Sequence, residues 1–130
     1  MKGDKDLYVR TRGVILNKKG RWNVDNNVLY EELQKSHAQN KLTDTAAILF
    51  KILVENIVSM KTYKNPDDAD ECISAGIEEL IIKWKKFDME KKNPFSYFTT
   101  VATFAITNTW NKLHGGKYPT ISIDNFTNRF

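Results

Sequence analysis

Residues 43–60 read TDTAAILFKILVENIVSM, and this stretch carries the strongest core signal in the chain. Thr43 or Asp44 supplies a capping side chain at its start. The stretch predicts a helix with one buried face, because apolar residues recur at the three- and four-residue spacing of such a face, at Ala46, Leu49, Phe50, Leu53, Ile57 and Met60.

Three more helices are expected around this one. Before it, Asp25 or Asn26 caps a helix that runs to about His37. After it, Asn65-Pro66 and Asn93-Pro94 each place a capping Asn before a Pro in the first turn, where a missing N–H costs nothing. The inward residues are Val28, Leu29 and Leu33 in the first helix, and Ile73, Ile77, Leu80, Ile81, Trp84 and Phe87 in the third.

The predicted fold class is all-α, a compact helical bundle of about four helices. The chain has 130 residues, of which 41% are apolar, and this favours one domain with a real core. The bundle should span residues 25–116, with the last helix ending before Gly115-Gly116. Residues 1–24 form a basic arm, irregular or with a short strand within Leu7–Leu16, and residues 117–130 form a short tail. The arm and the tail are the only segments that resemble linkers.

Several classes of protein are disfavoured by composition. No segment approaches the ~20 apolar residues of a membrane helix, and the start lacks a signal peptide, so a soluble, cytoplasmic protein is expected. Cys72 is the only cysteine and cannot form an internal disulfide. His37 and His114 are too far apart to suggest a zinc pair. We expect no metal and no cofactor.

Charge is segregated along the chain. Residues 1–24 contain seven basic residues, whereas residues 65–81 contain six acidic residues and neither Lys nor Arg. Lysines follow at positions 83, 85, 86, 91 and 92. A phosphate polymer would be repelled by the acidic run and attracted by the lysines, which suggests two different partners. Alternatively, the acids and lysines complement the dipole of the third helix.

The last predicted helix has an unusual composition. Its aromatic residues are interleaved with Ser, Thr and Asn, and no acidic residue occurs between Asn93 and Lys112. Such a surface suits nucleic acid, because rings stack on unpaired bases for about 1–3 kcal/mol each. Some rings should be exposed, since one inward stripe cannot hold all of Phe95, Tyr97, Phe98, Phe104 and Trp110.

Residues 72–88, CISAGIEELIIKWKKFD, followed by residues 93–100, NPFSYFTT, resemble region 2 of sigma-70 family factors. The resemblance covers about Asp68 to Leu113. It is most like the late-transcription sigma factors of T-even-like bacteriophages, which share the Gly-Ile-Glu centre, the Phe-Asp pair and the Asn-Pro opening. It implies a protein without catalysis of its own that acts in the host bacterial cytoplasm in promoter-specific transcription initiation.

The resemblance implies RNA polymerase core as a partner. In that family the third helix docks on the clamp helices of the polymerase largest subunit, a basic and apolar surface. An acidic run would steer association with such a surface. Carried over by position, the docking candidates are Glu71, Ser74, Ala75, Ile77, Glu78, Leu80 and Ile81.

The resemblance also implies promoter DNA as a partner. The last helix and the preceding turn would bind the minus-10 element, capture the non-template single strand and stabilise the melted bubble. Phe98 falls where family members often carry the Tyr that stacks on a flipped adenine, so it is the first choice for trapping the base. Lys86, Lys91 and Lys92 would contact phosphate, Asn93, Phe95, Ser96, Tyr97 and Thr100 would line the strand, and Asn108 would reach a base edge or phosphate upstream.

The sequence departs from primary sigma factors, which carry two Trp residues at the positions of Val101 and Ala102. Phe104 is the candidate replacement for this wedge at the upstream fork. Minus-35 recognition is expected to be absent, and a co-activator is a further candidate partner. Phage late factors carry a C-terminal peptide that binds the replication sliding clamp, and its candidate residues here are Ile121, Ile123, Asp124 and Phe126.

Other functions remain in competition. A helical repressor that binds duplex DNA, or a polymerase-binding adaptor without promoter melting, would need no base stacking. Residues 93–97 faintly resemble an amino-methyltransferase motif but lack its second Pro and any glycine-rich cofactor loop. Cys72 is a weak nucleophile candidate, since it has apolar neighbours and no nearby His. Strand preference distinguishes the leading alternatives, because a repressor prefers duplex DNA.

Overall fold

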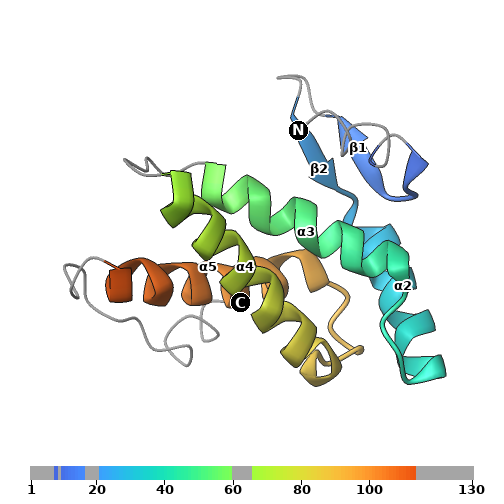
Figure 1. The fold of residues 1–130 in the computed structure, drawn as a ribbon. Coiled ribbons are helices and arrows are strands. Elements are labelled where there is room, and N and C mark those ends of the chain that lie inside the picture. Colours follow the sequence, from blue (N-terminus) through green and yellow to red (C-terminus); the bar gives the residue numbers. More distant parts are fainter. Residues whose placement is uncertain (1–7, 9, 17–20, 60–65, 114–130) are drawn as a thin grey trace.

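The computed structural model describes residue 8 and residues 10–16, 21–59 and 66–113, and every structural statement below concerns these residues. They form the helical bundle that was predicted, together with a short hairpin (Figure 1). In chain order the elements are β1 (Val14–Leu16), β2 (Trp22–Val24), α2 (Asn26–Gln39), α3 (Asp44–Ser59), α4 (Pro66–Lys83), the 3-10 helix η1 (Trp84–Lys86) and α5 (Pro94–Leu113).

The starts of α2 and α3 follow the capping signals in the sequence, whereas the predicted cap Asn65 lies outside the described residues. The Asp25 carboxylate accepts hydrogen bonds from the backbone N–H groups of Asn27 and Val28, at 2.8 and 3.2 Å. The Thr43 hydroxyl accepts one from the N–H of Ala46 at 3.1 Å, at the start of α3. These bonds satisfy N–H groups that have no partner within the helix.

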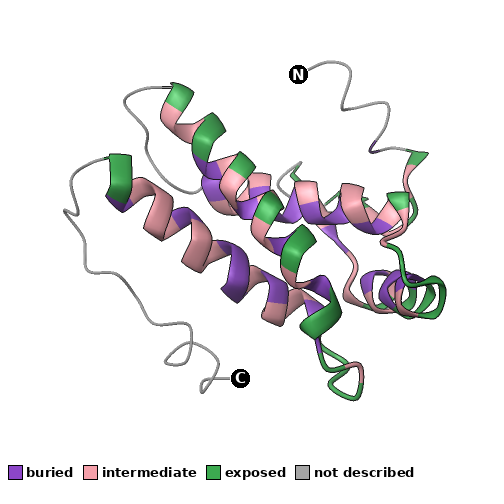
Figure 2. Ribbon diagram, turned by 60° about the horizontal axis from the view of Figure 1, so that its bottom comes forward, coloured by how far each residue is buried: buried purple, intermediate pink, exposed green. Residues whose placement is uncertain are grey.

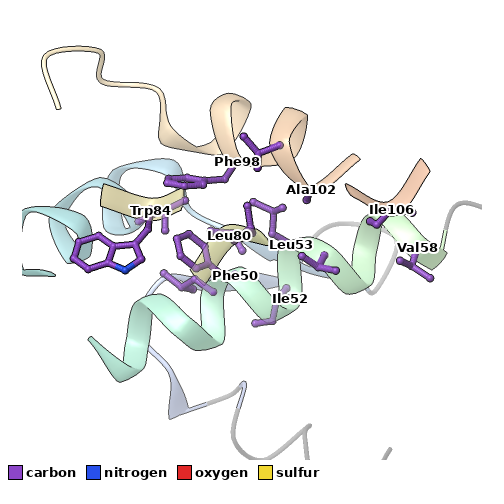
Figure 3. Packing of buried hydrophobic residues seen from close by; sticks show 14 of the residues in the cluster. Phe50, Ile52, Leu53, Val58, Leu80, Trp84, Phe98, Ala102 and Ile106 are labelled. Atoms are coloured by element: carbon purple, nitrogen blue, oxygen red, sulfur yellow. The ribbon is translucent and has the colours of Figure 1, made fainter. Parts of the chain in front are cut away.

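The centre of the molecule is α3, which packs against β2, α2, α4 and α5. Figure 3 shows Phe50 of α3, Leu80 of α4 and Phe98 of α5 pointing toward one another, and all three are fully buried. The prediction of one buried face for α3 is incomplete, since Ile52 and Val54 are also buried. A helix covered on several sides has little surface left for polar residues.

The N-terminal arm is packed onto the bundle. β1 and β2 are antiparallel, with Val14 opposite Val24, and Figure 1 shows this hairpin beside α3. The expected strand within Leu7–Leu16 is therefore reduced to Val14–Leu16, and the partner strand was not foreseen. Tyr8 and Val24 are buried, so the interpretation of the arm as a linker is wrong for its described part.

The end of α4 differs from the expectation. We expected this helix to continue through Trp84 and Phe87, but α4 ends at Lys83 and η1 follows. Phe87 then adopts an extended backbone, with φ −64° and ψ 128°. The chain must reverse within a few residues to begin α5, which is incompatible with a longer regular helix. Trp84 and Phe87 nevertheless remain in the core, at 5% and 4% exposure.

Candidate nucleic-acid interface

A groove lies between the segment after α4 and the first turns of α5, and its volume is about 490 Å³. We call it the lysine groove. The residues that line it are Lys86, Phe87, Asp88, Lys91, Asn93, Ser96, Tyr97 and Thr100. All of these except Phe87 and Asp88 were DNA-binding candidates from the sequence, so the groove contains six of the residues that the resemblance selected.

A tight turn shapes one wall of the lysine groove. The Asp88 carboxylate accepts a hydrogen bond from the N–H of Glu90 at 3.0 Å, and the Asp88 carbonyl accepts one from the N–H of Lys91 at 3.0 Å. Lys91 is exposed at the end of this turn. The Phe87-Asp88 pair therefore has a structural role here, because Phe87 forms a buried wall and Asp88 fixes the turn.

Tyr97 supplies the accessible ring of the groove. Its side chain is partly buried, and its ring centroid lies 5.2 Å from that of Phe87. Burial raises the pKa of the Tyr97 phenol, and the positive charge of Lys83 opposes this rise only in part. The phenol is therefore neutral at physiological pH and can donate a hydrogen bond, in the same groove as Lys86 and Lys91.

The structure does not support the assignment of Phe98 as the base-stacking residue. Its side chain is fully buried, with ring centroids 4.7 Å from Phe50 and 5.6 Å from Phe87. Phe98 points into the core because α5 presents that face to α3. A base could reach this ring only if the core opened. Tyr97, one residue earlier, points toward the groove instead.

The other candidates in α5 divide into three groups. Val101 is fully buried and is not available to DNA. Thr100 is buried at 4% exposure and donates its hydroxyl to the Ser96 carbonyl at 3.0 Å, so it contributes only a wall. The structure places Phe95, Phe104 and Asn108 at intermediate exposure outside the set that lines the groove.

The dipole of α4 does not account for the positions of all the lysines. Lys83, in the last turn of α4, pairs with Glu79 at 2.6 Å, which fits the dipole interpretation. Lys91 and Lys92 lie well beyond the end of α4, at exposed positions. Lys92 faces α2 and lines a separate pocket with Tyr30, whereas Lys86 and Lys91 line the groove. The lysines at positions 86, 91 and 92 are therefore not explained by the dipole of α4.

The outer face of α4 presents a different surface, which we call the α4 strip. Figure 2 shows a row of exposed residues along this helix. The spacing of the strip residues places them on one side of the helix. The strip consists of Glu71, Ser74, Glu78, Ile81 and Ile82.

The strip corrects part of the predicted polymerase-binding set. Leu80 is fully buried and packs in the core, so it is not available as a docking anchor. Ala75 and Ile77 are at intermediate exposure. Ile81 is 48% exposed, and Ile82, which the sequence interpretation missed, is 62% exposed.

Some expectations concern other parts of the chain. The sliding-clamp candidates Ile121, Ile123, Asp124 and Phe126 lie outside the described residues. Over the described ranges, no three His, Cys, Asp or Glu side chains are grouped so as to hold a metal ion. In the same ranges, no helix has the length and apolar character needed to span a membrane. The Cys72 side chain is fully buried beside the Ile106 carbonyl.

Comparison with known proteins gives one match. Residues 51–114 match the family model described as sigma-70 region 2. No curated protein and no solved structure matches the chain. The matched span begins in α3 and extends one residue past α5, so it contains both the lysine groove and the α4 strip.

Proposed function

We propose that the protein is a sigma factor that binds RNA polymerase core and recognises promoter DNA, because residues 51–114 match the family model of sigma-70 region 2. The observation that carries the proposal is the presence of two chemically different surfaces on one packed unit. The α4 strip is acidic and apolar, and the lysine groove is cationic and aromatic. Each surface suits one of the two partners.

The α4 strip suits docking on a basic and apolar protein surface. Ile81 and Ile82 are exposed next to the carboxylates Glu71 and Glu78. Burying one such isoleucine is worth about 1.5–3 kcal/mol, whereas surface carboxylates mainly guide encounter and register. We therefore assign affinity for polymerase to the isoleucine pair and orientation to the two glutamates.

The lysine groove suits a single strand of the melted promoter. Lys86 and Lys91 would contact phosphates, and Asn93 and Ser96 would reach base edges or sugars. Tyr97 would offer its ring to an unpaired base. Extruding a base costs a few kcal/mol, and one stack returns about 1–3 kcal/mol, so the stack and the lysine contacts must act together.

Two observations support the narrower proposal of a late-transcription factor of the phage type that recognises a minus-10 element. The residue series over 68–113 resembles that subgroup. In addition, Val101 and Ala102, at the positions of the tryptophan pair of primary factors, are fully buried. The wedge at the upstream fork would have to come from another residue, and partly exposed Phe104 is our candidate.

A duplex-binding repressor is the second candidate function. It would use the same lysines for phosphates but would have no use for a ring within a groove. Stacking on a side chain requires an unpaired base, and the position of Tyr97 therefore favours the sigma proposal. A repressor should bind duplex DNA without polymerase, whereas a sigma factor should capture the non-template strand only with core present.

Run-off transcription with purified bacterial core on an AT-rich, late-type promoter tests the proposal. We expect initiation that depends on both core and this chain. Tyr97→Ala should lower transcription while core binding in a pull-down is retained, and Tyr97→Phe, which keeps the ring, should stay near wild type. Wild-type duplex binding without core, or no initiation with core, would favour the repressor. Equal activity of Tyr97→Ala would show that Tyr97 does not hold the strand.

A further inference from the structure

Two side chains of α2 contact the turn that carries the groove residues. The Asn26 side-chain amide donates a hydrogen bond to the Lys92 carbonyl at 3.2 Å. Its oxygen accepts one from the backbone N–H of Phe95 at 3.0 Å. Four residues along α2, the Tyr30 hydroxyl donates to the Met89 carbonyl. These three bonds join α2 to both ends of the segment that contains Lys91 and Asn93.

The contact of Asn26 with Phe95 completes the start of α5. The first N–H groups of a helix have no partner within it and are usually capped by a nearby side chain. Here the capping oxygen comes from a residue 69 positions earlier in the chain. Only a side chain with both a donor and an acceptor can hold Lys92 and Phe95 at once, and the carboxamide of asparagine has both.

We propose that Asn26, supported by Tyr30, is a positioning residue that sets the geometry of the lysine groove for the captured strand. This inference rests on the proposed function. Lys91 and Asn93 lie on an exposed segment between η1 and α5, which would otherwise have to be ordered when DNA binds. Fixing the segment beforehand reduces that entropic cost and so favours capture.

Hydrogen exchange of the full chain tests the contact without DNA. We expect Asn26→Ala to lose protection at the Phe95 amide, with far-UV circular dichroism close to wild type and an unfolding midpoint lowered by no more than the cost of one lost cap. Asn26→Asp keeps the accepting oxygen and should retain most of that protection, a result that a general loss of packing would not give. Asn27→Ala, the same substitution at an exposed neighbour, is the matched control.

Two binding readouts test the positioning role. With core present, Asn26→Ala should weaken capture of a fluorescent minus-10 non-template strand about fivefold, the scale of one lost cap. Its affinity for core should be unchanged, because the α4 strip is not altered. A merely structural role would lower both affinities together.

Each remaining outcome overturns a stated part of the proposal. Unchanged Phe95 protection in Asn26→Ala would show that the contact does not hold the turn. Lost protection with unchanged strand capture would show that the contact does not position the groove. If the wild-type chain captures no strand with core, the proposed function fails and the positioning role fails with it, even where the Phe95 amide responds as expected.

Discussion

The rings of Tyr97 and Phe98 stand at 85° to each other with their centroids 5.0 Å apart, in edge contact at neighbouring positions of α5. Phe98 is fully buried against Phe50, whereas Tyr97 lines the lysine groove. Adjacent aromatic residues in one helix therefore have separable roles, one in stability and one at the surface.

This separation predicts two different mutant phenotypes. Phe98→Ala should lower the free energy of unfolding by about 3–5 kcal/mol, because it leaves a cavity in the core. Tyr97→Ala should cost much less stability but should impair strand capture. Urea denaturation and strand binding in the presence of core measure the two effects. A small stability loss in Phe98→Ala would contradict its place in the core.

A second prediction concerns the exposed isoleucines of α4. Ile82→Ser should weaken binding to polymerase core by about tenfold, since the burial of one large apolar side chain would be lost. Because Ile82 is 62% exposed, stability should change little. Surface plasmon resonance with immobilised core measures the affinity. The matched control is Leu16→Ser, at a large apolar side chain of β1 that is 59% exposed and lies outside the α4 strip. Equal affinity of both variants would remove Ile82 from the docking surface.

Gly76 provides a third prediction, about the packing of α4 on α3. A Cβ atom at this position would lie 2.8 Å from Cγ1 of Val54, closer than real Cβ contacts allow. Gly76→Ala should therefore destabilise the fold by about 1–3 kcal/mol through overpacking. The double variant with Val54→Ala should recover part of this loss. Thermal unfolding compares the three proteins, and additive losses would contradict the contact.

A fourth prediction concerns pH. Burial tends to raise the pKa of the Glu32 carboxyl, but hydrogen bonds from Thr43 and Lys35 and the charges of Lys35 and Arg12 lower it below 4.5 overall. A group with a lowered folded-state pKa stabilises the fold above its unfolded value, and this contribution is lost as pH falls through the folded value. Stability should therefore fall below about pH 4.5 in part because Glu32 is protonated.

Glu32→Gln tests this assignment, since the amide does not titrate. Urea midpoints measured from about pH 6 to pH 3 should show a wild-type advantage that shrinks as the solution is acidified. A constant difference between the two proteins across that range would show that the Glu32 charge does not contribute.

A fifth prediction uses salt. Each phosphate contact made by a lysine releases bound counterions, so Lys91→Ala should reduce the slope of log affinity against log salt by about 0.7 for a single strand. The matched control is Lys41→Ala, at an exposed lysine that follows the C-terminal end of α2. The slope is measured by titrating labelled strand into the core complex. Equal slopes for wild type and Lys91→Ala would place Lys91 off the strand.

The sequence was sufficient to predict the presence of the helices, because the signals that start a helix are local. Capping residues such as Asp25 and Thr43, and a Pro after Asn at the start of α5, act within a few residues. The hairpin was only partly predicted, because β1 and β2 have three residues each and depend on contact with α3. Short strands of that kind have little intrinsic preference.

The candidate site was harder to predict, because the exposure of a side chain depends on the rotation of its helix. Composition identified α5 as aromatic and polar but could not tell that Phe98 faces α3 and Tyr97 faces the turn. Similarly, Leu80 and Ile82 are both large apolar residues, yet Leu80 is buried and Ile82 is exposed. The contact between Asn26 and Phe95 had no local signal, since 69 positions separate the residues.

The most direct test is core-dependent promoter opening, followed by 2-aminopurine fluorescence at the minus-10 non-template strand. We predict that fluorescence rises when core and the wild-type chain are both added, and that Tyr97→Ala lacks the rise although it binds core normally. A rise with core alone, or an equal rise with Tyr97→Ala, would contradict the claim that this groove holds the opened strand.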